Sequence, residues 1–248
     1  TAVGPRSVIV RDGDDVVDLG RRAMLPGTVN VHNHSFQSLL RGIGDDLPFL
    51  EWRDRALYRH SPEIAARGVY TGALFAFGEM LLHGVTTVCD FFYLNDGGNE
   101  NAAQVIAAAQ VLGIRVVLAR CFYDWDGAPA VYRESPTDAQ RRFAELHAAF
   151  SGKPMVSVQA APHSLHGASE AMIRAAVESA RAVGEPWHIH LAEEAYQVDD
   201  ALQKYGARPV HVLDRMGLLG EDLVAVHGCW FDEGERQRLA ESGASLAY

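Results

Sequence analysis

The apolar stretch "VNVHNH" at residues 29–34 ends with two histidines, His32 and His34, that are separated by one residue. Successive side chains on a β-strand point to opposite faces, so both imidazoles would share one face of a strand. Two imidazoles on one face can bind a divalent metal ion. In a random sequence of 248 residues with 11 histidines, about half an occurrence of two histidines separated by one residue is expected. The pair therefore needs support from the rest of the sequence.

The segments that would position these histidines alternate between strand and helix from residue 26 onward. The expected strands are residues 29–34, 85–93, 115–123, 155–163, 187–193, 223–228 and 244–248. The expected helices are residues 61–84, 99–112, 137–150, 169–183 and 232–241, with two shorter helices within 197–217. Repeated βα units with apolar strands are typical of a parallel sheet with right-handed crossovers. We therefore expect an α/β fold, a (β/α)8 TIM-like barrel with seven strands visible and the eighth missing from this chain.

The N-terminal residues differ from this pattern. Residues 7–25 indicate short strands around a tight Asp-Gly turn, and they are too few to form a core alone. We expect residues 1–25 to be part of a small β-domain and residues 26–248 to form a barrel that is incomplete at its C-terminal end. In the helix expected at 61–84, Ser61 is the predicted N-cap and Gly84 the predicted C-cap.

Side chains that can bind metal or transfer protons gather at the C-terminal ends of the expected strands, where a βα barrel has its active site. These residues are His32, His34, Tyr93, His163, His190, Glu193 and His227. His188 and His190 share a strand face, and His190 is the better candidate ligand because it lies nearer the strand end. Glu193 lies three residues after His190, past the end of the strand, so its carboxylate can lie beside a metal site without being a ligand itself. This clustering strengthens the interpretation of His32 and His34 as metal ligands.

Composition excludes several classes of partner. The formal net charge is −10 with only two lysines, Lys153 and Lys204, which argues against nucleic acid and anionic membranes as partners. The three cysteines form no CxxC motif, so neither a disulfide framework nor a cysteine zinc site is indicated, and we expect a cytoplasmic protein. No apolar run reaches the length of a membrane span, and the N-terminus lacks a signal-peptide pattern. The expected partners are a small-molecule substrate and further copies of the chain in a homo-oligomer.

Five segments in fixed order resemble a known family. "LPGTVNVHNHSFQSLLRG", "HGVTTVCDF", "APHS", "HIHLAEE" and "AVHG" are similar to the amidohydrolase superfamily, specifically its mononuclear-metal deaminase branch. The resemblance covers residues 22–248. "FLEWRDRALY" followed by "SPE", and "HIHLAEEAYQVDD" followed by "RPVHVL", are most similar to N-formimidoylglutamate deiminases. The first segment is equally similar to deaminases and chlorohydrolases that act on amino-substituted purines, pterins and triazines.

The resemblance implies a metal centre and a proton carrier. His32, His34 and His190 would bind one divalent ion, with zinc the first choice and iron the second. Glu193 would shuttle protons, and His227 would hydrogen-bond the attacking hydroxide or the substrate. The family takes its fourth metal ligand from an aspartate on strand 8, which this sequence does not reach. The chain is therefore either a fragment of a longer protein or a barrel with an incomplete site.

The resemblance also implies where the substrate binds. His163 would contact the substrate, and Arg53 matches one of two arginines that hold the carboxylates of formimidoylglutamate in its deiminases. The second arginine is replaced by His166, which is a weaker partner for a carboxylate. Formimidoylglutamate is therefore expected to be a poor substrate, and a molecule with one carboxylate or a flat aminoheterocycle is expected instead. The expected pocket contains Gln37, Arg53, Tyr93, His163 and His166.

These observations together predict a metal-dependent hydrolase that attacks an amidine-like or aminoheterocyclic carbon and releases ammonia. Hydroxide would add to the carbon, Glu193 would protonate the leaving nitrogen, and His227 would stabilise the developing charge. Two alternatives remain open. The same residues could displace chloride instead of ammonia, or the chain could be a catalytically silent relative that serves as an interaction scaffold.

Overall fold

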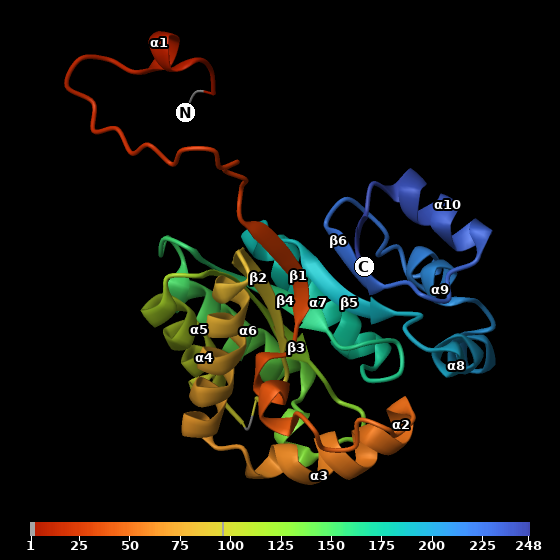
Figure 1. Cartoon of the computed structure of the whole chain (residues 1–248). Coiled ribbons are helices and arrows are strands. Elements are labelled where there is room, and N and C mark those ends of the chain that lie inside the picture. Colours follow the sequence, from red (N-terminus) through yellow and green to blue (C-terminus); the bar gives the residue numbers. More distant parts are fainter. Residues whose placement is uncertain (1–2, 96) are drawn as a thin grey trace.

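The fold is a parallel, nearly closed barrel (Figure 1), seen in a computed structural model that describes residues 3–95 and 97–248. Seven strands form one sheet in chain order, and each pairs in parallel with the next. They are β1 (Thr28–Asn33), β2 (Val85–Phe92), β3 (Arg115–Phe122), β4 (Val156–Pro162), β5 (Trp187–Leu191), β6 (Leu223–His227) and β7 (Ser245–Ala247). This architecture confirms the expected TIM-like fold with seven strands.

Helices follow the strands and cover the outside of the sheet (Figure 1). The longer ones are α4 (Ala66–Leu82), α5 (Glu100–Leu112), α6 (Pro136–Phe150), α7 (Glu170–Val183), α8 (Ala195–Tyr205), α9 (Pro209–Arg215) and α10 (Glu233–Ser242). Short segments are α1 (Arg6–Ile9), η1 (Ser35–Leu40), α2 (Phe49–Trp52), η2 (Arg53–Leu57), α3 (Tyr58–His60), η3 (Ser61–Glu63) and η4 (Ala130–Tyr132). In the described part of the chain, no helix has both the length and the apolar character needed to cross a membrane.

Local sequence explains why these elements form where they do. The side chain of Ser169 accepts a hydrogen bond from the Met172 backbone N–H and so caps the start of α7, while Gly184, with φ 73°, ends the helix in the left-handed conformation. All five residues of β5 are buried, as expected for a strand covered on both faces. The core lies between the sheet and the helices and includes the fully buried Trp187 and Phe143.

The predicted N-cap of the helix at 61–84 is wrong, whereas Gly84, with φ 82°, follows the last turn in the left-handed conformation expected of a helix-ending glycine. Residues Ser61–Glu63 form a separate 3-10 turn, and α4 begins only at Ala66 without a side-chain cap. Ser61 is buried, and its hydroxyl pairs with the hydroxyl of Tyr132 instead of capping a helix. A tertiary contact has therefore replaced the local role that the sequence predicts.

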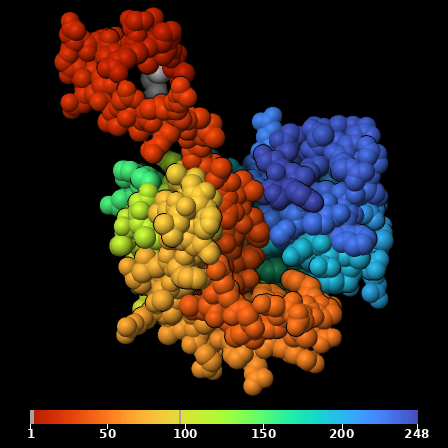
Figure 2. All heavy atoms as spheres, viewed as in Figure 1, coloured from red at the N-terminus to blue at the C-terminus, as the bar shows by residue number. Residues whose placement is uncertain are grey.

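The predicted strands in residues 7–25 are also wrong. The turn at Asp12 and Gly13 is present, but residues 10–27 contain no strand, and α1 is a single helical turn. Val17, Met24 and Leu25 are more than four-fifths exposed. Figures 1 and 2 show this segment projecting from the barrel. Two short strands without a partner sheet bury too little apolar surface to be stable in water.

The two ends of the sheet, β1 and β7, are not paired with each other in the described residues. On the outer face of β1, Val29 and Val31 are 58% and 43% exposed. The barrel is therefore open along this edge, at the position where the eighth strand was expected.

Candidate metal centre and active site

Three histidines converge at the C-terminal ends of β1 and β5. His32 lies in β1, His34 follows that strand directly, and His190 lies in β5. One ring nitrogen from each lies within 4.8 Å of the others. The Nε2 atoms of His32 and His190 are 3.3 Å apart. Two nitrogens bound tetrahedrally to zinc at about 2.1 Å are separated by about 3.4 Å, so this spacing suits a metal ion.

Backbone carbonyls orient two of these rings as metal ligands. Nδ1 of His34 lies 2.6 Å from the carbonyl oxygen of Phe91, and Nδ1 of His190 lies 2.7 Å from that of His163. A carbonyl oxygen can only accept, so Nδ1 carries the proton and Nε2 keeps a free lone pair. His32 Nδ1 is buried without a hydrogen-bond partner among the described residues. A set of neutral imidazoles with lone pairs turned inward fits zinc or iron.

Burial also keeps these histidines neutral. It lowers the pKa of His34 to about 4, and it lowers the pKa values of His32 and His190 as well. The neighbouring imidazoles lower the pKa values of His32 and His190 further because two adjacent positive charges would repel each other. At neutral pH all three rings are therefore in the form that binds a metal.

His227 reaches the cluster through an unusual backbone conformation. In the register of β5 with β6, Leu191 is opposite His227 and His190 is opposite Val226, so strand alternation would turn His227 away from His190. His227 has φ 74°, and its ring lies 4.9 Å from that of His32 and 5.4 Å from that of His190. Non-glycine residues in this region cost about 1–3 kcal/mol and are common at functional sites.

Glu193 completes the group. Ala192, with φ 48°, turns the chain at the end of β5, and a carboxylate oxygen of Glu193 lies 3.6 Å from Nε2 of His227. Burial, together with a smaller contribution from the charge of Glu194, raises the pKa of Glu193 to about 7. A carboxyl group with a pKa near 7 can both take up and release a proton at neutral pH.

This raised pKa has a consequence for stability. The folded chain holds the Glu193 proton more tightly than the unfolded chain, so stability is lost as pH rises from the ordinary pKa of 4.5 through about 7. We expect Glu193→Gln, measured with a metal chelator present, to stabilise the chain by about 1–3 kcal/mol at pH 8 and by much less at pH 4.5. Thermal unfolding at both pH values measures this difference. An equal effect at the two pH values would contradict it.

A cavity of about 800 Å³ opens above the histidines. Its wall contains all ten residues that the sequence singles out: Gln37, Arg53, Tyr93, His163 and His166 with His32, His34, His190, Glu193 and His227. Aromatic side chains form much of the remaining wall, among them Tyr58, Tyr123, Tyr132 and Tyr196. The structure therefore brings the predicted residues together in one site.

Comparison with known proteins places the chain in a family. Residues 23–247 match the amidohydrolase family. The chain belongs to the amidohydrolase family. It is 31% identical over 250 residues to the 5-methylthioadenosine/S-adenosylhomocysteine deaminase of Syntrophobacter fumaroxidans, a match that covers 100% of this chain and 55% of that protein. The resemblance to the deaminase branch of the superfamily is thus confirmed.

Solved structures of other amidohydrolases agree. An adenosine deaminase from Xanthomonas campestris with bound zinc superposes with a TM-score of 0.81 at 31% identity, over 89% of this chain and 48% of that one. The zinc complex of an atrazine chlorohydrolase from Arthrobacter aurescens has a TM-score of 0.82 at 21% identity, over 90% and 52%, which shows the shared fold. This amidohydrolase chain spans about half the length of these relatives.

In this amidohydrolase, Arg53 and His166 both line the cavity, and both lie against Trp125. Arg53 begins the π-helical turn η2, and its guanidinium lies 5.0 Å from the ring of Tyr58 and 5.6 Å from that of Trp125. The His166 ring lies 4.9 Å from the Trp125 ring. Elsewhere in the cavity, Gln37 Nε2 donates to the Tyr93 hydroxyl. The Arg53 guanidinium in the cavity wall therefore lies between two aromatic rings.

Sequence reasoning missed most of the aromatic wall. Tyr123 lies at the end of an expected strand, as Tyr93 does, and that position could have identified it. Trp125 and Tyr132 lie in the loop between β3 and α6, where no periodic pattern indicates a direction for the side chain. Tyr132 can be assigned to the cavity wall only from the tertiary structure, and so can the contacts of Trp125 with Arg53 and His166 beside the cavity.

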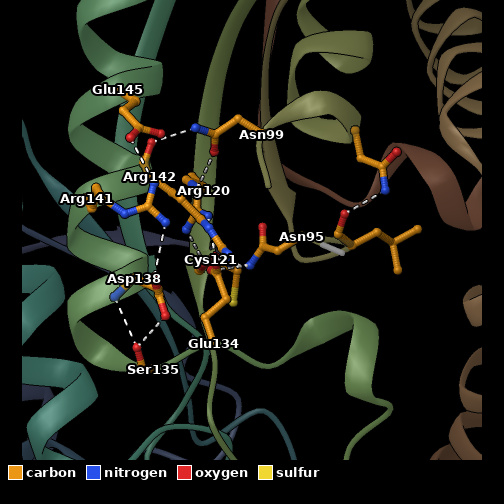
Figure 3. A network of polar contacts seen from close by, with 12 residues as sticks. Asn95, Asn99, Arg120, Cys121, Glu134, Ser135, Asp138, Arg141, Arg142 and Glu145 are labelled. Atoms are coloured by element: carbon orange, nitrogen blue, oxygen red, sulfur yellow. Dashed lines mark hydrogen bonds and ion pairs between the residues drawn. The ribbon is translucent and has the colours of Figure 1, made fainter. Parts of the chain in front are cut away.

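A buried polar network holds this loop at its ends (Figure 3). Glu134 accepts hydrogen bonds from Arg120 at 2.8 Å, from Arg142 at 2.5 Å and from Asn95 at 2.9 Å. The backbone N–H of Glu134 donates to the carbonyl of Tyr123 at 2.9 Å. The side chains of Arg120 and Glu134 are completely buried, so the pairing offsets the cost of removing both charges from water.

Proposed function

We propose that the protein containing this chain is a metal-dependent deaminase that hydrolyses an aminoheterocyclic carbon and releases ammonia. The observation that carries the proposal is the convergence of three neutral imidazoles beside a carboxyl group whose pKa is near 7. The deaminase names of its relatives support this reaction class. The assignment of individual roles below belongs to the same proposal.

His32, His34 and His190 would hold the metal, for which we propose a single zinc ion. A divalent ion in such a site lowers the pKa of a water molecule to about 7 and so makes hydroxide available at neutral pH. Lys153 and Lys204 are both exposed, so neither side chain lies inside the barrel. Neither lysine could therefore help to hold a second metal ion beside the first.

The side chains around the metal site would move protons and orient the substrate. Glu193 would accept a proton from the attacking water while a carbon–oxygen bond forms. It would then donate that proton to the departing nitrogen as the carbon–nitrogen bond breaks and ammonia leaves. His227, 3.6 Å from Glu193, would stabilise the charge that develops on the ring during attack. His163 would contact the heterocycle from β4.

The cavity wall suggests the class of substrate. The aromatic rings in the cavity wall suit a flat ring system, because they can pack against it with their faces or their edges. The guanidinium of Arg53 can receive an acceptor group or a single carboxylate at the far end of the substrate. Gln37 and Tyr93 line the same cavity and could hydrogen-bond the heterocycle. We propose an adenine nucleoside, as the names of the relatives also suggest.

A substrate assay tests this proposal. Ammonia release from adenosine, 5-methylthioadenosine and S-adenosylhomocysteine is measured beside release from formimidoylglutamate. We expect at least one nucleoside to be deaminated, with kcat/KM for formimidoylglutamate below about 10⁴ M⁻¹s⁻¹. The physical reason is that His166, largely neutral at pH 7, replaces a bidentate carboxylate partner.

Three outcomes would overturn the proposal. A high kcat/KM for formimidoylglutamate would show that His166 is no obstacle to two carboxylates. Chloride release from a chlorinated triazine without ammonia release would favour the chlorohydrolase alternative. Bound metal without turnover of any of these compounds would favour the scaffold. Self-association, the lack of a nucleic-acid partner and a cytoplasmic location stay predictions from the sequence.

A further inference from the structure

We propose that Asp90 is a positioning residue that holds His34 in the geometry needed to bind the metal. This inference rests on the proposed metal site. Asp90 lies in β2 and is completely buried. Its Oδ1 accepts hydrogen bonds from Asn33 Nδ2 at 2.9 Å and from the Ser35 backbone N–H at 2.7 Å. Its Oδ2 accepts from the Ser35 hydroxyl at 2.9 Å.

These contacts surround His34 in the sequence. Asn33 precedes it and Ser35 follows it, so one carboxylate holds the chain on both sides of the ligand. Phe91, the residue after Asp90, accepts from Nδ1 of His34 through its carbonyl oxygen. Two consecutive residues of β2 thus control both the backbone around His34 and the rotation of its ring.

The end of β1 explains why such support is needed. Asn33 is the last residue of the strand and is opposite Asp90 in the register of β1 with β2. Beyond Asn33 the chain enters the 3-10 helix η1, so the hydrogen bonds between β1 and β2 no longer pair with its backbone groups. The Asp90 carboxylate takes over this role for the buried Ser35. A ligand placed one residue past a strand would otherwise be free to vary in position, which weakens metal binding.

A second aspartate–serine pair in the same barrel provides a matched control. Asp124, just after β3, accepts from the Ser169 backbone N–H at 2.7 Å and from the Ser169 hydroxyl at 2.6 Å. Ser169 caps α7 and is not next to a proposed metal ligand. In both pairs an aspartate carboxylate accepts hydrogen bonds from the backbone N–H and the hydroxyl of a serine. Only the serine of the Asp90 pair is next to a proposed metal ligand.

The experiment measures the zinc affinity of the full-length protein that contains this chain by competition with a chromophoric chelator. We compare the unmodified protein with Asp90→Asn, Ser35→Ala and Asp124→Asn. We expect Asp90→Asn to weaken zinc binding about 10- to 100-fold, because an amide cannot accept from all three donors. Ser35→Ala keeps the charge of Asp90 and removes one hydrogen bond, so a smaller loss of about three- to tenfold is expected. Asp124→Asn should leave zinc affinity unchanged.

Cobalt substitution supplies a second readout. The visible absorption of bound Co²⁺ depends on ligand geometry, so it should shift in Asp90→Asn and stay the same in Asp124→Asn. Equal zinc affinity in the unmodified protein, Asp90→Asn and Ser35→Ala would overturn the inference. An equal loss in Asp90→Asn and Asp124→Asn would assign Asp90 to general stability and also overturn it. Should Asp90→Asn not fold, Ser35→Ala decides. Absence of zinc binding in the unmodified protein would refute the proposed metal site itself.

Discussion

Replacement of His190 by alanine is expected to lower kcat/KM for ammonia release by more than about 10³-fold. His190 is the ligand that β5 contributes, and its Nε2 lies 3.3 Å from that of His32 across the barrel. Without it the two remaining imidazoles both come from the end of β1, and the proposed ion loses its link to the opposite side of the site. Elemental analysis should show a matching loss of bound zinc.

His188 gives the control for this experiment. It lies two residues earlier on the same face of β5, and its Nε2 is 2.6 Å from the side-chain oxygen of Gln159. It is thus a buried histidine with a satisfied hydrogen bond. His188→Gln should retain zinc and activity within about threefold. Full activity and full metal content in His190→Ala would rule out the metal site described here.

Glu193→Gln is expected to lower kcat by about 10²–10⁴-fold while the bound metal is retained. The amide has nearly the shape of the carboxyl group but cannot carry a proton from the attacking water to the leaving nitrogen. KM should change little, because Glu193 is proposed to act on the proton and not on the substrate. Steady-state kinetics together with metal analysis separates the loss of proton transfer from the loss of metal.

The neighbouring acid offers a matched comparison. Glu194 is the N-cap residue of α8, and it lies next to Glu193 in the chain. Glu194→Gln should change kcat by less than about threefold, since Glu194 does not line the cavity and acts on Glu193 only through its charge. Near-normal turnover in Glu193→Gln would remove Glu193 from the mechanism. A similar loss in both variants would point to an effect of charge alone.

Much of this architecture follows from the sequence alone. The strand expected at 85–93 is β2 at Val85–Phe92, and the helix expected at 169–183 is α7 at Glu170–Val183. These elements are set by apolar periodicity and by capping residues close in the chain, so local physics is sufficient to predict them. The shared face of His32 and His34 follows in the same way, from the two-residue period of a strand.

Other features depend on residues that are distant in the sequence. His32 and His190 are 158 residues apart, and only closure of the sheet brings them together. The inward turn of His227 depends on a left-handed φ that strand alternation does not predict. The pKa of Glu193 depends on burial, and the position of His34 depends on a carboxylate in the neighbouring strand. Residue type and spacing therefore determined which side chains could do the chemistry. The tertiary structure decided their directions and protonation, because these depend on contacts and burial that form only when the strands assemble.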